Sequence, residues 1–226
     1  MNSRPKVTVA LLEDDDVPTA FQVLSESFSH NAPLVNNLYP NHDTPAGRAS
    51  GSERFLAWKL VGKDTTFLKA VLDSDSGEPS KIIGIAIWAH LAKPLPSYLG
   101  DIENLEKHWP DGENREFVVQ LWKNFVYPRN QAITESNGKG VYALELLAIH
   151  PDYQRMGAGK ALVDWGNKKA DELRLQGVVE ATSFGVPLYE KCGFHSQIEE
   201  MAFATDEKFN GRQKPKLTFL TREPET

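Results

Sequence analysis

Two glycines separated by one residue lie between an apolar run and a helix-like run, in the segment Gln154–Gly159 (QRMGAG). A helix begins there with backbone N–H groups that have no acceptor inside the helix. Those groups lie at the positive end of a helix dipole worth roughly half an elementary charge, which favours a bound anion. Glycine at positions 157 and 159 removes side chains that would hold an anion away. The spacing therefore predicts a diphosphate-binding corner.

Three glycine-rich phosphate motifs can be compared with this corner. The nucleotide P-loop requires four residues between its glycines and then Lys and Ser or Thr, but one residue separates these glycines and Ala161 replaces the hydroxyl. The dinucleotide fingerprint requires a third glycine where Leu162 stands, which disfavours a nicotinamide enzyme. The third pattern, Gln/Arg-x-x-Gly-x-Gly/Ala, fits every fixed position from Gln154 to Gly159.

This third pattern resembles motif A of the GNAT superfamily, the acyl-CoA-dependent N-acyltransferases. The similarity includes the preceding strand LELLAIHP, the aromatic Tyr153 and the following helix KALVDW. The segment Pro187–Phe194 (PLYEKCGF) resembles a later motif of the same superfamily. Upstream, FLKAVLDSDSGEPSKIIGIAIW is similar to a hairpin of many members, so the resemblance covers residues 66–90 and 141–195.

The resemblance implies an α/β (α+β) fold, with a mixed, mostly antiparallel central sheet split at the acyl-CoA site and flanked by helices. It implies one N-acetyltransferase domain over residues 1–226, with an acceptor-site insertion around 92–140. The implied activity is transfer of an acetyl group from acetyl-CoA to an amine by direct attack in a ternary complex. A catalytically weak acyl-CoA-binding protein of the same fold is the alternative.

The resemblance also implies where acetyl-CoA binds. The cofactor would lie between strand 141–149 and the strand ending at Ser183, and its pantetheine arm would bond to backbone groups of Leu147 and Ile149 like an added strand. A backbone N–H near Leu147 would serve as the oxyanion donor. Ser183 would bond the pantetheine, and Lys191 or Lys160 would pair with a phosphate. The implied cofactor-binding residues are Leu147, Ala148, Ile149, Gln154, Arg155, Met156, Gly157, Ala158, Gly159, Lys160, Ser183 and Lys191.

Acyl transfer to an amine requires a base, because an amine with a pKa near about 10.4 is protonated at neutral pH. Glu145 is the predicted base, since it is a carboxylate inside the apolar strand YALELLAI, where a charge is costly unless it faces a wet cleft. Residues 143, 145 and 147 are expected to share a face. The alternative is a salt-bridged glutamate, and superfamily members with the base two residues earlier would match Ala143.

Tyr189 is the predicted acid. The leaving thiol has a pKa near about 8.5 and tyrosine one near about 10, so tyrosine stays protonated at neutral pH and can donate its proton as the C–S bond breaks. A core tyrosine under the last strands is the alternative. Cys192 is expected to be a small buried thiol. The six histidines show no metal spacing, which predicts no metal.

Composition excludes some partners. A net charge of −6 argues against a nucleic-acid binder. There is no secretory signal and no apolar run of the roughly 18 residues that span a bilayer, so no membrane partner and a cytoplasmic location are expected. The expected acceptor is a small-molecule amine or a peptide amine, and the expected state is a monomer or homodimer. Acceptor specificity is assigned to residues 28–39 and 92–140, whose aromatic residues would line a pocket or form the inner face of a helix: Tyr98, Trp109, Trp122, Phe125 and Tyr127.

These residues need a scaffold that brings the segments together. Periodicity and turn formers predict a first strand, two helical regions, a hairpin, one helix in the insertion, and then alternating strands and helices. The central strand 141–149 leads into a helix that is expected to end at Gly177. The expected elements cover residues 6–12, 14–28, 47–62, 65–91, 116–127, 141–149, 157–176, 177–183, 186–192, 194–203 and 215–221.

Overall fold

A seven-stranded sheet forms the centre of the protein. The computed structural model describes residues 6–29, 32–73, 80–97 and 105–225, and the side chains of all of these except residue 105. The strand order is β1-β2-β3-β4-β5-β7-β6, and every pair is antiparallel except β4–β5. The predicted mixed, mostly antiparallel sheet is confirmed. The strands are β1 (Val7–Leu11), β2 (Thr65–Leu72), β3 (Lys81–Leu91), β4 (Val141–Ile149), β5 (Gln176–Thr182), β6 (His195–Ile198) and β7 (Leu217–Arg222).

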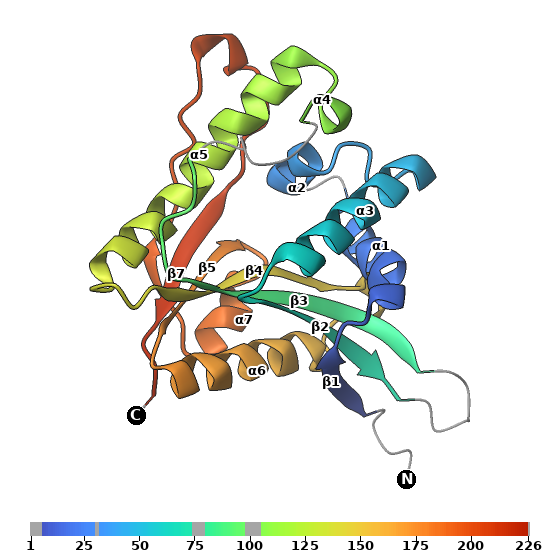
Figure 1. Ribbon diagram of the computed structural model, residues 1–226, viewed down its shortest axis with the longest axis vertical. Coiled ribbons are helices and arrows are strands. Elements are labelled where there is room, and N and C mark those ends of the chain that lie inside the picture. The colour runs from blue at the N-terminus through green and yellow to red at the C-terminus, as the bar shows by residue number, and fades with distance from the viewer. Residues whose placement is uncertain (1–5, 30–31, 74–79, 98–104, 226) are drawn as a thin grey trace.

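Helices cover both faces of the sheet. Figure 1 shows α6 along one face, with α7 nearby, and α1, α3 and α5 on the opposite side. Short 3-10 turns occur at Asp14–Asp16, Pro151–Tyr153 and Glu207–Phe209. The helices are α1 (Val17–Phe28), α2 (Pro33–Leu38), α3 (Pro45–Val61), α4 (Leu105–His108), α5 (Gly112–Glu135), α6 (Ala158–Leu173) and α7 (Val186–Lys191).

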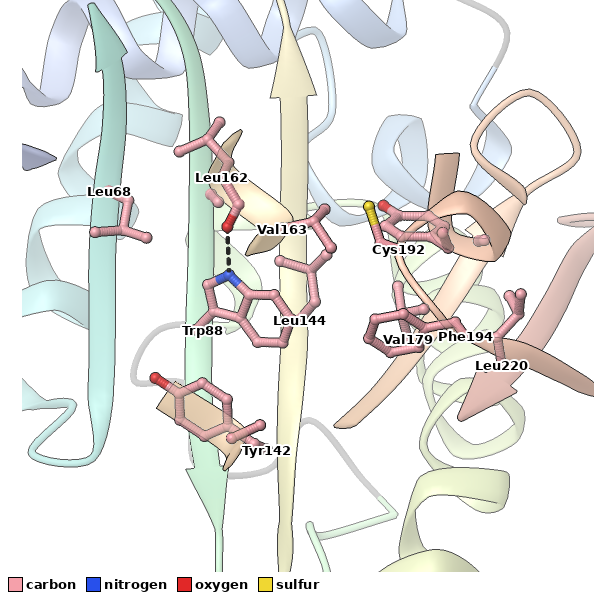
Figure 2. Close-up of a cluster of buried hydrophobic side chains, with 14 of the residues drawn as sticks. Leu68, Trp88, Tyr142, Leu144, Leu162, Val163, Val179, Cys192, Phe194 and Leu220 are labelled. Atoms are coloured by element: carbon pink, nitrogen blue, oxygen red, sulfur yellow. Dashed lines mark hydrogen bonds between the residues drawn. The ribbon is translucent and has the colours of Figure 1, made fainter. Parts of the chain in front are cut away.

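Helix α6 is tightly packed on its sheet face. Trp88 of β3 is fully buried there, and its indole Nε1 donates a hydrogen bond of 3.3 Å to the Leu162 carbonyl (Figure 2). The indole occupies the space beside Gly166, where a Cβ atom would lie 1.9 Å from Trp88 Cε2. Because the core is this close-packed, the position of α6 and of its N-terminus relative to β4 is set by the sheet.

Several boundaries differ from the expectation. Helix α6 ends at Leu173 rather than near Gly177, because Arg174 adopts a left-handed conformation with φ 55° and closes the helix itself. Gly177 lies in β5 instead. The strand expected over 194–203 covers only His195–Ile198, and the helix expected over 116–127 extends over Gly112–Glu135.

The structure also contains elements that the sequence pattern did not indicate. Helix α2 follows α1 across part of the segment assigned to acceptor recognition. Strand β7 pairs between β5 and β6, so the last strand of the chain is not an edge strand. Both features depend on contacts between distant segments, which periodicity along the chain does not report.

Candidate functional site

Strands β4 and β5 separate from each other within the sheet. Their parallel pairing ends at Ala143 and Val178, although β4 continues to Ile149 and β5 to Thr182. A cavity of about 2400 Å³ opens at this split and continues to the first turn of α6 on one side and to α1, α2, α3 and α5 on the other. The predicted split of the sheet is therefore confirmed, and one cavity joins its two sides.

The backbone of β4 presents free donors to the split. The N–H of His150 donates to the Ile83 carbonyl of β3 over 2.9 Å. Because N–H groups of an antiparallel strand point alternately to its two edges, those of Leu147 and Ile149 point away from β3. The same alternation directs the N–H of Ala148 to β3, and its side chain is buried in the cluster under α1.

The first turn of α6 is an open rim of backbone donors. Gly157 has φ 95°, and a Cβ atom there would meet nothing within 4 Å. Among the described residues, no protein acceptor takes the N–H groups of residues 155–160, and the first bond of the turn runs from Ala161 to the Gly157 carbonyl. Since these donors stand at the positive end of a helix of 16 residues, the rim suits an anion.

Most of the residues implied for the cofactor meet at this cavity. Lys160 lies there but already pairs with Asp164 at 2.5 Å, whereas Lys191 forms no ion pair with any described residue. Met156 is 37% exposed and does not line the cavity. Ala148 is buried and does not line the cavity either. The implied cofactor residues that line the cavity are Leu147, Ile149, Gln154, Arg155, Gly157, Ala158, Gly159, Lys160, Ser183 and Lys191.

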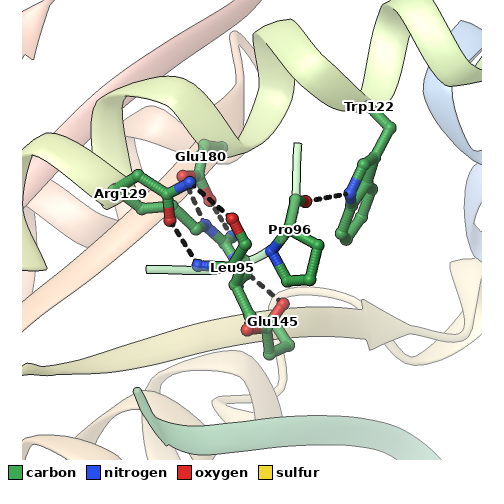
Figure 3. A network of polar contacts seen from close by, with 7 residues as sticks. Leu95, Pro96, Trp122, Arg129, Glu145 and Glu180 are labelled. Carbon is green, nitrogen blue, oxygen red and sulfur yellow. Dashed lines mark hydrogen bonds and ion pairs between the residues drawn. The ribbon is translucent and has the colours of Figure 1, made fainter. Parts of the chain in front are cut away.

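Glu145 lies in a buried ion triad. Both of its carboxylate oxygens accept from Nη1 of Arg129 in α5 at 2.8 Å, and the same guanidinium binds Glu180 of β5 through Nε at 2.8 Å and through Nη2 (Figure 3). The side chains of Arg129, Glu145 and Glu180 are 0%, 10% and 1% exposed. The triad thus links β4 to β5 where their backbone pairing has ended.

The charges of the triad are strongly coupled. Burial alone would lower the pKa of Arg129, but Glu145 and Glu180 together raise it above its ordinary value. Burial raises the pKa of Glu180, which Arg129 only partly offsets. With one guanidinium and two carboxylates, the fully ionised triad carries one excess negative charge at the cavity wall, since Glu145 and Glu180 both line it.

A β-bulge at Glu145 changes which side chains share a face. Trp88 of β3 pairs with Leu144, and the adjacent Ile87 pairs with Leu146, so Glu145 is the extra residue. Ala143 and Glu145 face α5, but the bulge turns Leu147 to the α6 face. The expectation that residues 143, 145 and 147 share one face is wrong, because an inserted residue shifts the alternation by one.

Arg129 and Glu180 were not identified from the sequence. Glu180 carried a usable signal, since it is a lone carboxylate in the apolar strand GVVEAT, as Glu145 is in YALELLAI. Two carboxylates on neighbouring buried strands require a cation, because an isolated buried charge is too costly. The sequence offered no means of choosing Arg129 as that cation.

The ring of Tyr189 is packed against another side chain, and its hydroxyl has no hydrogen-bond partner among the described residues. The residue lies in α7, is 7% exposed, lines the cavity, and packs edge-on against Phe194 with ring centroids 6.1 Å apart. No described residue forms a hydrogen bond with its hydroxyl. Burial, and then the neighbouring Cys192, raise the pKa of Tyr189 well above its ordinary value. Cys192 is a buried free thiol, as expected.

The other end of the cavity is aromatic. Trp122 and Phe125 of α5 line it together with residues of α2 and α3, and Trp122 Nε1 donates 3.0 Å to the Pro96 carbonyl (Figure 3). Of the other aromatic residues considered, Trp109 is buried behind the wall, Tyr127 is 61% exposed, and Tyr98 lies outside the described residues. Within the described ranges there is no His, Cys, Asp and Glu cluster suited to a metal ion.

Part of the chain matches a known family model, and the fold is similar to solved structures. Residues 125–196 match the family model of the acetyltransferase (GNAT) domain. No curated protein matches the chain. A Corynebacterium glutamicum structure of histone acetyltransferase HPA2 and related acetyltransferase is similar, with 20% identity, a TM-score of 0.59 and coverage of 97% of this chain and 98% of that one.

Two further structures share the fold. The mosquito arylalkylamine N-acetyltransferase like 5b has 16% identity and a TM-score of 0.63, over 96% of this chain and 100% of that one. The Salmonella typhimurium protein yncA with its cofactor acetyl-CoA has 13% identity and a TM-score of 0.56, over 97% and 94%. The resemblance to the GNAT superfamily is therefore confirmed: residues 125–196 match its acetyltransferase domain model, and the chain shares the fold of these acetyltransferase structures.

Proposed function

We propose that this protein is an N-acetyltransferase that moves an acetyl group from acetyl-CoA to an amine by direct attack in a ternary complex. The observation that carries the proposal is the rim of unpaired backbone donors at residues 155–160, which opens on the same cavity as the split between β4 and β5. A diphosphate suits the rim, and an extended amide chain suits the free edge of β4.

The backbone supplies most of the cofactor contacts in this proposal. The N–H groups of residues 155–160 hold the diphosphate, and Lys191 is placed to pair with a phosphate. The N–H groups of Leu147 and Ile149 bind the pantetheine arm, with Ser183 on the opposite wall. The N–H near Leu147 also receives the developing charge on the thioester oxygen, as a preorganised oxyanion donor.

Two side chains move protons. The amine nitrogen attacks the thioester carbon, Glu145 takes a proton from the amine directly or through water, the C–S bond breaks, and Tyr189 donates its proton to the leaving thiolate. Glu145 acts from within the triad, which holds its carboxylate at the cavity wall. The raised pKa of Tyr189 keeps its hydroxyl protonated at neutral pH, as an acid requires.

The acceptor is proposed to be a small-molecule amine. The aromatic end of the cavity suits such a molecule, and the carboxylates of the triad attract its ammonium form. The mosquito protein of the same fold is an arylalkylamine N-acetyltransferase like protein, which supports the same class. Among the described residues, no helix is both long enough and apolar enough to cross a bilayer.

Calorimetric titration with CoA tests the cofactor part. Wild-type protein should bind CoA. At a free CoA concentration about one hundred times Kd, its free energy of unfolding should rise by about 2.7 kcal/mol. Gly157→Ala should weaken CoA binding roughly tenfold or more, because a side chain disfavours the left-handed backbone by about 1–2 kcal/mol and displaces the rim donors.

Gly138→Ala is the matched control. Gly138 has φ 84°, meets nothing within 4 Å and lies in the turn before β4, so alanine carries the same backbone strain away from the cavity. It should lose similar stability and keep its CoA affinity. Equal CoA affinity of both variants and the wild type, or no thiol release from acetyl-CoA with any amine, would contradict the proposal.

A further inference from the structure

The wall of the cavity formed by α3 and α4 carries a guanidinium without an acidic partner. Arg54 lines the cavity, and its Cζ lies 4.5 Å from the ring centroid of Tyr39 and 4.8 Å from that of Trp109. Its Nη1 donates 2.5 Å to the Leu38 carbonyl. Among the described residues, no carboxylate forms an ion pair with it, and Glu53, the preceding residue, pairs with Lys107.

A second donor lies beside this guanidinium. His108 lines the same end of the cavity, and its Nδ1 is buried without a hydrogen-bond partner. Burial, and then the charge of Arg54, lower the pKa of His108, so the ring is neutral at pH 7 and donates from one nitrogen. A buried polar atom without a partner is costly, and a ligand acceptor would remove that cost.

The two ends of the cavity have opposite charge. Tyr39 lines the same cavity with its ring centroid 4.5 Å from Arg54 Cζ; burial raises its pKa, Arg54 lowers it, and Glu145 raises it. Arg54 and Glu145 do not form an ion pair with each other. Aromatic side chains, among them Trp122 and Phe125, occupy the wall of the same cavity.

We propose that Arg54 and His108 form an anion subsite for the acceptor, and that the acceptor is an amine that also carries a carboxylate. The proposal rests on the proposed function for the amine end. The guanidinium lies against both rings, and apart from the Nη1 bond to the Leu38 carbonyl its N–H groups have no partner among the described residues, which leaves donors for a planar carboxylate. One guanidinium and one neutral imidazole balance a single negative charge rather than the two of a phosphate.

Matched acceptors test this subsite. In wild-type protein, 4-(aminomethyl)benzoate should exceed 4-(aminomethyl)benzamide in kcat/KM by roughly ten- to hundredfold, the range expected for a charged hydrogen-bonded pair. Arg54→Met should abolish that preference by lowering only the rate with the acid, and Arg54→Lys should retain part of it. The phosphonate analogue separates the two anions: if it is preferred over the carboxylate, the assignment of a carboxylate is overturned.

Arg48→Met is the control on the same helix, since Arg48 does not line the cavity and donates to the Asp43 carbonyl. It should keep the acid preference. CoA affinity, measured for each variant, shows that the fold and the cofactor site are retained.

A binding measurement separates failure of this inference from failure of the proposed function. Titration with 4-methylbenzoate, which has no amine, should show binding to the wild type and a roughly tenfold or greater loss in Arg54→Met. If no amine is acetylated but this difference is seen, the proposed function fails and the subsite stands. If amides and acids react equally, or if Arg54→Met slows both equally, the subsite is overturned while the acetyltransferase stands.

Discussion

Tyr189 is held in a way that would suit the proton donation proposed for it. Its ring packs against Phe194, whereas its hydroxyl has no partner among the described residues and faces the cavity. The side chain is therefore fixed by packing and free to hydrogen-bond a ligand. Burial raises its pKa above the ordinary tyrosine value, so the hydroxyl remains protonated at neutral pH.

Tyr189→Phe should lower kcat by roughly a hundredfold or more, which is the usual contribution of a general acid. CoA affinity and the free energy of unfolding should change little, because the hydroxyl makes no bond within the described part of the protein. Steady-state kinetics with acetyl-CoA measures kcat, CoA titration measures the affinity, and urea unfolding measures the free energy of unfolding. A variant with wild-type kcat across the pH range would remove Tyr189 from the mechanism.

Glu145 illustrates a role that residue type alone leaves open. A carboxylate in an apolar strand indicates either a base in a cleft or a member of an ion pair. In the structure, Glu145 lines the cavity and also forms an ion pair with Arg129. Its role as base stays a prediction. The ion pair explains how the carboxylate is retained at this depth, since a buried charge without a partner would be far more costly.

At the scale of elements, the packing of α6 on β3 decides where the donor rim lies. Gly166 lets the helix approach the indole of Trp88, whose Nε1 bonds to the same helix at Leu162 (Figure 2). A larger residue at this contact must push the helix away from the sheet. The rim at residues 155–160 belongs to the first turn of that helix, so its position depends on the contact.

Gly166→Ala should destabilise the protein by about 1–3 kcal/mol, the usual cost of overpacking a core, although alanine favours helices. Its Cβ atom would lie 1.9 Å from Trp88 Cε2, which cannot move aside within the sheet. Gly211→Ala, where a Cβ atom meets nothing within 4 Å, should stay within about 0.5 kcal/mol of the wild type. Urea unfolding measures both; equal stability would show that the core accommodates the methyl group.

At the scale of the whole molecule, the Arg129 triad joins three elements around the split. Arg129 comes from α5, Glu145 from β4 and Glu180 from β5, and together they connect the strands beyond the last backbone pair at Ala143 and Val178 (Figure 3). The two strands can therefore diverge enough for a ligand while remaining tied. The same triad places two carboxylates in the cavity wall.

Arg129→Met should destabilise the protein by about 3–5 kcal/mol, because it leaves two carboxylates buried without a cation. Arg115→Met on the same helix should change stability by less than about 1 kcal/mol, since Arg115 has only a 3.7 Å contact with the exposed Glu106 and a long, 3.5 Å hydrogen bond to the Trp109 carbonyl. Urea unfolding of the two variants at neutral pH gives the comparison.

The pH dependence of Arg129→Met supplies a second test. Burial already raises the pKa of Glu180 with Arg129 present, and removing the cation raises it further. An acid with a raised folded pKa contributes stability that is present below its unfolded pKa and is lost as pH rises through the folded pKa. The deficit relative to wild type should therefore narrow as pH falls towards the ordinary glutamate value of 4.5. A constant deficit would assign the loss to packing instead.

Local pattern was enough to locate the rim of backbone donors in the candidate site. The glycine spacing at 157 and 159, the strand before it and the helix after it all lie within one continuous segment, and backbone donors at a helix start need no distant partner. Helix ends were less predictable: Arg174 closes α6 in a left-handed conformation that glycine usually takes, so the next glycine, Gly177, predicts an end that is too late.

The acceptor side depended on contacts that sequence spacing does not encode. Arg129 lies 16 residues from Glu145 and 51 from Glu180, and Arg54 lies far in sequence from Trp109, whose ring it covers. The bulge at Glu145 exists only against β3, and it reversed the expected facing of Leu147. The sequence by itself determined the strand–turn–helix corner and its donors, because those are local properties of the backbone. Only the tertiary structure decided which charges meet across the cavity, because burial brings together residues from separate segments and then requires them to compensate one another.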